Sequence, residues 1–68
     1  MAVMADPRAD AISDLAALSR RLLTRAQLLA KRAETLTGEG RKAVEDEARE
    51  LAEDAGRVAL AVKRLTSN

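Results

Sequence analysis

The 68-residue chain contains neither cysteine nor histidine. It can therefore form no disulfide, and it cannot bind a metal ion through thiolate or imidazole ligands. The same absence removes the Ser/His and Cys/His pairs used in nucleophilic catalysis, so we expect no enzymatic activity. A chain of this size rarely gains more than about 3–5 kcal/mol of stability from one hydrophobic core. We therefore expect it to associate with a second copy of itself.

Phenylalanine, tyrosine and tryptophan are also absent. The core must then be built from aliphatic residues, and no aromatic side chain is available to stack on a base or a sugar. Lys and Arg total 12 against 11 Asp and Glu, so a net charge of +1 gives no general attraction to nucleic acid or to an anionic membrane. Charged residues interrupt every apolar run, which argues against a membrane span. We expect a cytoplasmic protein without a cofactor.

Proline occurs once and glycine three times, and most of these residues indicate helix boundaries. Asp6 before Pro7 is typical of a helix start, because the carboxylate can accept from free amides of the first turn. Gly38 can adopt the left-handed backbone conformation that closes a helix, and together with Gly40 it favours a turn between two helices. We expect a frayed tail at residues 1–6, a helix over about 7–37, a turn at 38–40 and a helix over about 41–65. Residues 7–66 then form a single helical hairpin.

Both predicted helices carry an apolar residue at alternating steps of three and four, the heptad spacing of a coiled coil. The positions of this predicted seam are Ile12, Leu15, Ser19, Leu22, Ala26, Leu29, Ala33, Leu36, Val44, Ala48, Leu51, Ala55, Val58, Val62 and Leu65. Only Ser19 is polar. The spacing predicts an all-α fold in which the two helices pack antiparallel along this seam.

Folding the chain back at the turn places large residues opposite small ones, as close packing requires. Leu22 then faces Ala55. Ala33 faces Val44 in the same register. On one flank of the seam the register also predicts two ion pairs, Arg25 with Asp54 and Arg32 with Glu47.

The opposite flank stays apolar and carries small side chains. We call it the small-residue face; it comprises Ala16, Leu23, Ala30, Ala52, Gly56 and Ala59. An apolar surface of this kind needs a cover. We expect two hairpins to pack through it into an antiparallel four-helix bundle. Gly56, in the middle of a helix, fits a close approach by a neighbouring helix.

The function that these patterns favour is a non-catalytic scaffold, adaptor or regulatory subunit that forms a homodimer and binds another protein. A candidate patch for that partner combines apolar and basic side chains, namely Leu18, Arg21, Arg25 and Leu28. Such a patch suits a helix of another protein.

The alternative is a small nucleic-acid-binding regulator that uses the basic face of the first helix. Arg20, Arg21, Arg25, Lys31 and Arg32 supply that face. The architecture resembles that of the small dimeric helical hairpins that regulate plasmid copy number, which bind RNA on a helix face. The carboxylates of the second helix lie outside the seam, so we expect no metal site among them.

Overall fold

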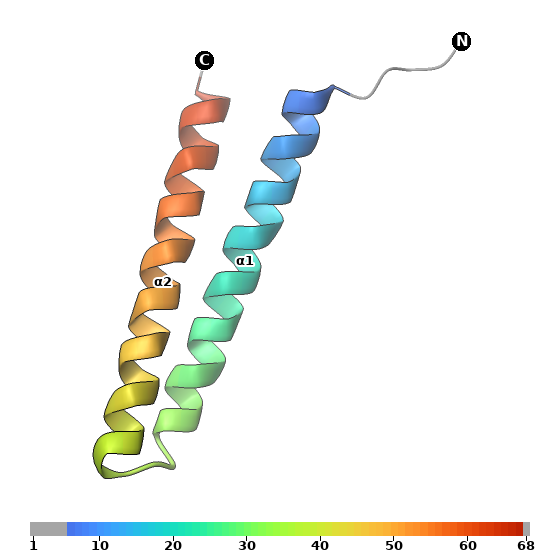
Figure 1. Ribbon diagram of the computed structural model, residues 1–68. Helices are drawn as coiled ribbons and strands as arrows, with labels where there is room; N and C mark the ends of the chain where they lie inside the picture. Colours follow the sequence, from blue (N-terminus) through green and yellow to red (C-terminus); the bar gives the residue numbers. More distant parts are fainter. Residues whose placement is uncertain (1–5, 68) are drawn as a thin grey trace.

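The computed structural model describes residues 6–67. They form two helices, α1 (Pro7–Ala33) and α2 (Gly38–Thr66), which lie side by side and run in opposite directions (Figure 1). The prediction of an all-α antiparallel hairpin is confirmed. Of the tail expected at residues 1–6, all but Asp6 lies outside the described residues, as does Asn68.

The start of α1 follows from Asp6 and Pro7. The Arg8 backbone N–H donates to Oδ1 of Asp6 over 3.0 Å, and Pro7 occupies the first turn, where its missing N–H is not needed. α1 then continues for 27 residues and α2 for 29. At 1.5 Å per residue they are about 40 and 44 Å long, so each helix offers a long lateral surface.

The turn lies nearer the N-terminus than the sequence predicted. α1 ends at Ala33 and not at about residue 37, and α2 begins at Gly38, so the expected turn at 38–40 is wrong. The Thr35 hydroxyl donates to the Arg32 carbonyl over 2.8 Å, and the N–H groups of residues 34–36 each bond to the carbonyl three residues earlier. These tighter bonds satisfy the last carbonyls of α1 and end the helix.

Gly38 has the left-handed backbone conformation expected of it, with φ +63°, but at the first residue of α2. The sequence alone assigned this conformation to the end of the preceding helix. At the other end α2 reaches Thr66, beyond the predicted limit of about residue 65. The Thr66 hydroxyl donates to the carbonyls of Val62 and Lys63, over 3.0 and 3.1 Å.

Alanine forms the closest part of the helix interface. Among residues 6–67 the only buried side chains are those of Ala26, Ala33, Ala48 and Ala55, and all four are predicted seam positions. The larger seam residues beside them are half-buried, while Leu65 is exposed. Small side chains let the two backbones approach, so the aliphatic residues flank the contact line and do not fill it.

Two hydrogen bonds join the helices. The Ser19 hydroxyl donates to the Ala55 carbonyl over 3.0 Å, which satisfies the one polar residue of the seam. At the open end, Nη2 of Arg8 donates to the Leu65 carbonyl over 2.7 Å. That bond places a positive charge at the C-terminus of α2, where the helix dipole favours it.

Replacement of Gly38 by alanine is expected to destabilise the hairpin by about 1–2 kcal/mol, because an L-residue is strained at a positive φ. Urea denaturation followed by circular dichroism measures the change. Gly40→Ala is the matched control: a methyl group there meets no atom within 4 Å and φ is not positive, so its stability should stay equal or rise. Equal losses in the two variants would contradict this account of the turn.

Candidate interaction surfaces

The predicted ion pairs between the helices do not form. Within residues 6–67 every ion pair lies inside α2. Asp54, the predicted partner of Arg25, instead lies 3.3 Å from Nη1 of Arg57, one turn further along its own helix. A neighbour on the same helix is reached with less loss of side-chain freedom than a residue across the seam, and an exposed pair contributes only about 0.2–1 kcal/mol in either case.

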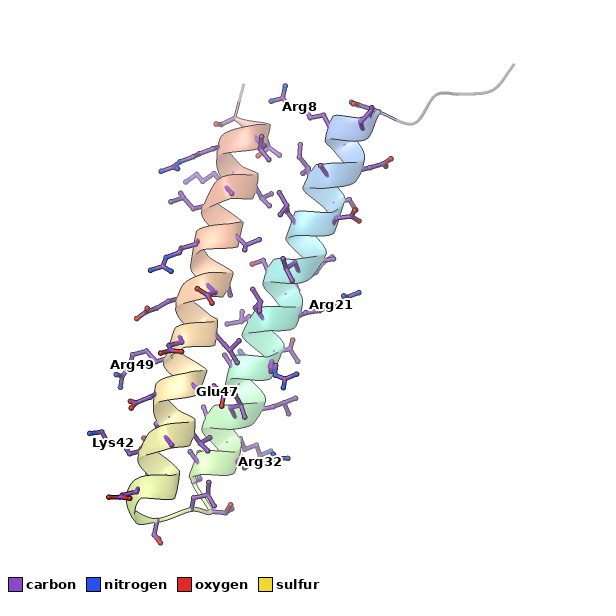
Figure 2. The ribbon with its side chains drawn as sticks, in the orientation of Figure 1. Arg8, Arg21, Arg32, Lys42, Glu47 and Arg49 are labelled. Atoms are coloured by element: carbon purple, nitrogen blue, oxygen red, sulfur yellow. The ribbon has the colours of Figure 1, made fainter. Side chains whose placement is uncertain are left out.

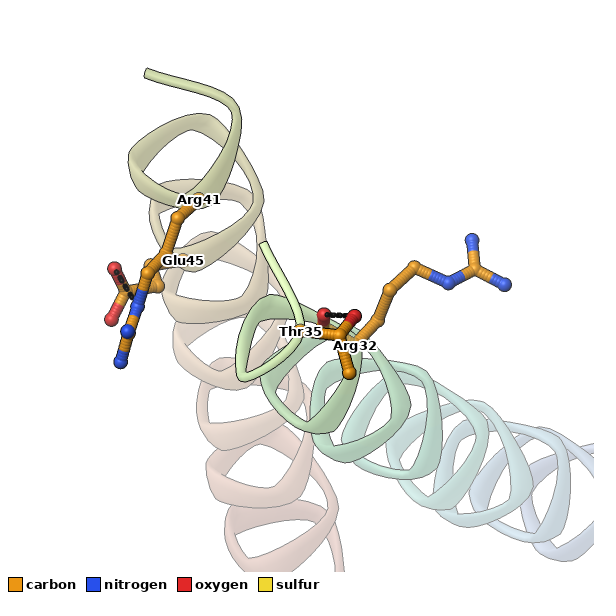
Figure 3. A network of polar contacts seen from close by, with 4 residues as sticks. All are labelled: Arg32, Thr35, Arg41 and Glu45. Atoms are coloured by element: carbon orange, nitrogen blue, oxygen red, sulfur yellow. Dashed lines mark hydrogen bonds and ion pairs between the residues drawn. The ribbon is translucent and has the colours of Figure 1, made fainter. Parts of the chain in front are cut away.

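The second predicted pair, Arg32 with Glu47, is also wrong. Arg32 extends away from both helices, whereas Arg41 and Glu45 of α2 pair at 3.5 Å (Figure 3). Arg21 and Arg32 project from α1 on the side away from α2, and Lys42 and Arg49 project from the opposite side of the hairpin (Figure 2). Arg21 and Arg32 are therefore left available to another molecule.

A basic surface with an apolar centre runs along α1. One groove of about 520 Å³ adjoins another of about 400 Å³, and the two share Arg25 and Leu28. We call the pair of them the Leu28 groove. Its lining residues are Arg21, Thr24, Arg25, Leu28, Leu29, Lys31, Arg32 and Thr35. The Leu28 side chain is 64% exposed, the highest value among the large aliphatic residues described.

The Leu28 groove overlaps the predicted partner patch without matching it. Arg21, Arg25 and Leu28 of that patch line the groove, whereas Leu18 is exposed and does not line it. Arg32 belongs to it, although the sequence reasoning placed that residue in an ion pair. The signal was present in the sequence: residues 21, 25, 28, 32 and 35 follow each other at steps of four and three, which puts them on one helix face.

A second, less charged groove lies on the small-residue face. Its volume is about 360 Å³ and both helices contribute to it. The lining residues are Leu23, Ala26, Gln27, Ala30, Glu45, Ala48, Arg49 and Ala52. Leu23 is the one large aliphatic side chain among them, and it is 46% exposed.

Three residues of the small-residue face do not line this groove. Ala16 is half-buried, and Gly56 and Ala59 are exposed further towards the open end of the hairpin. A methyl group added at Gly56 would meet no atom within 4 Å, so nothing in the single chain requires glycine there. The hairpin itself thus gives no packing reason for this residue.

The acidic residues of residues 6–67 do not gather into a group of three that could hold a metal ion. Over the same span, neither helix has the length of apolar sequence needed to cross a membrane. Comparisons with protein family models, with curated proteins and with solved structures find no match for the chain.

Proposed function

We propose that the chain is a non-catalytic assembly module: two copies pack through their small-residue faces into an antiparallel four-helix bundle, which binds another protein. The observation that carries this proposal is the composition of the buried core. The four buried residues are all alanine, and no large side chain described is fully buried. Burial of a whole leucine or valine contributes about 1.5–3 kcal/mol, and the single hairpin realises only part of that gain.

The groove on the small-residue face is better suited than the Leu28 groove to contact with a second copy. The groove is shallow because much of its lining is alanine, so another helix can approach closely and cover Leu23. These alanines are Ala26, Ala30, Ala48 and Ala52. Its rim carries opposite charges one helical turn apart, Glu45 and Arg49. Under a two-fold axis such a rim is self-complementary, because Glu45 of one copy can face Arg49 of the other.

Gly56 fits the same arrangement. A glycine in the middle of a helix costs about 0.5–1 kcal/mol relative to alanine, and the single hairpin offers space for a methyl group at this position. A neighbouring helix that crosses close to Gly56 leaves no space for a side chain and so explains the glycine. In the proposed dimer, the edge of the contact lies beside Ala52 and Ala59 on α2.

Sedimentation equilibrium combined with thermal melting over a range of protein concentrations tests the proposal. We expect twice the monomer mass at micromolar concentration and a melting temperature that rises with concentration, because folding and association are then linked. A helical protein that sediments as a monomer and melts at the same temperature at every concentration would contradict it.

A further inference from the structure

We propose that the Leu28 groove binds an acidic amphipathic helix of the partner protein. The inference deepens the proposed function, since it names the chemistry of the partner that the assembled hairpins would bind. It uses the side of α1 that the small-residue face leaves free. Dimer formation and partner binding therefore involve different residues and can be tested separately.

The charge of the groove favours an acidic ligand. Four basic residues line it, and none of the lining residues is acidic. The basic residues are Arg21, Arg25, Lys31 and Arg32. Within residues 6–67 none of these four side chains lies at ion-pair distance from a carboxylate. Arginine side chains that are not already paired can engage glutamate and aspartate without first breaking an internal bond.

The apolar centre of the groove favours a helix over a simple polyanion. Leu28 is flanked by Arg25 and Arg32, one turn away on either side, and Leu29 adds a half-buried wall. A helix with leucines at i, i+3, i+4 and i+7 can cover Leu28 while its glutamates reach the flanking arginines. From residue 21 to residue 32, within α1, the surface is about 17 Å long, which corresponds to roughly three helical turns of a partner.

A nucleic acid is a poorer match for this surface. Its phosphates could pair with the arginines, but they would leave Leu28 against a charged backbone, and the chain has no aromatic side chain on which a base could stack. In the register read from the sequence, Glu47 and Asp54 of α2 lie across the seam from Arg32 and Arg25, and they would repel phosphates that spread over it. The acidic helix can avoid them by contacting α1 alone.

The probe is a fluorescein-labelled synthetic helix of about 15 residues with leucines at the spacing above and glutamates between them. Its binding to the full-length protein is followed by fluorescence anisotropy. Two comparison probes are the same peptide with glutamine at every glutamate position, and a labelled duplex oligonucleotide. We expect the glutamate peptide to bind at least about tenfold more tightly than the glutamine peptide, and the difference to shrink as salt is added.

Matched variants locate the site. Leu28→Asp should weaken peptide binding at least about tenfold, whereas Leu60→Asp, at an exposed leucine of α2, should change it less than about twofold. The double variant R25E/R32E should also weaken binding at least about tenfold. Lys42→Glu, which changes the net charge by −2 where the double variant changes it by −4, controls for charge reversal away from the groove, because Lys42 projects from the opposite side of the hairpin (Figure 2). Circular dichroism checks that every variant remains helical.

The inference would be overturned by no binding of the glutamate peptide, by equal binding of the two peptides, by equal effects of the two leucine variants, or by tighter binding of the oligonucleotide that R25E/R32E abolishes. The last would assign the groove to nucleic acid. If R25E/R32E instead turned a dimer into a monomer, the groove would belong to a second copy. Sedimentation of the same samples reports the dimer independently, so failure of the proposed function and failure of this inference are distinguishable.

Discussion

Leu23→Glu is expected to abolish the dimer. Leu23 is the one large aliphatic side chain in the groove of the small-residue face and is still 46% exposed in the single hairpin. Because a little under half of Leu23 remains exposed, covering it contributes about 0.7–1.4 kcal/mol per copy, and a two-fold interface contains it twice. Loss of both contributions, together with the cost of burying two unpaired carboxylates, raises the dimer dissociation constant at least about 100-fold. Sedimentation equilibrium should show a monomer, and helicity at micromolar concentration should fall, since hairpin folding then lacks the support of association.

Leu60→Glu is the control for this experiment. Leu60 is 47% exposed and also belongs to a helix, but it lies outside both the seam and the small-residue face. The control should keep the wild-type mass and melting temperature. If both variants dimerise like the wild type, the small-residue face is not the interface. If both become monomers, association depends on exposed apolar area in general and not on this face.

Ala55→Leu is expected to lower the melting temperature by about 5–20 °C. Ala55 is 4% exposed, and its carbonyl accepts the Ser19 hydroxyl, so α1 passes directly over it. A leucine at this position must push the helices apart and break that hydrogen bond. Overpacking of this kind costs about 1–3 kcal/mol, and each kcal/mol shifts the midpoint of a small domain by roughly 4–8 °C. Thermal melting at one fixed protein concentration measures the shift.

Ala43→Leu provides the comparison. Ala43 is exposed on the same helix, so a leucine there has space and should leave the melting temperature almost unchanged. We expect a large fall in melting temperature for Ala55→Leu and little change for Ala43→Leu. A higher melting temperature for Ala55→Leu would mean that the helices can separate to bury the added leucine, which is incompatible with a close alanine contact.

Much of the fold could be predicted because its signals are local. Heptad spacing marks one stripe on each helix, and the positions it selects include all four buried alanines. The positions of Asp6 and Pro7 correctly predicted the start of α1. The end of α1 could not be placed, because Gly38 suits either the end of one helix or the entry to the next. The choice depended on how the hydroxyl and amides of residues such as Thr35 bond to the last carbonyls.

The candidate sites were less predictable for a different reason. The predicted register put Arg25 opposite Asp54 across the seam, but it could not say whether these flexible side chains would meet. Asp54 has Arg57 as a nearer neighbour along its own helix. Because exposed pairs differ by only a fraction of a kcal/mol, sequence spacing cannot rank them. The consequence is considerable: arginines assigned to the seam flank are left to line the Leu28 groove.

By itself the sequence determined that this chain forms two long helices, that they run antiparallel, and which stripe of each helix faces the other. Those properties depend on apolar periodicity and on the positions of glycine and proline, which act over one or two helical turns. Only the tertiary structure decided where the turn lies, that alanine alone is buried among residues 6–67, and that the basic side chains around Leu28 form no ion pair with α2. Those depend on distances between backbones and side chains that a linear spacing does not contain.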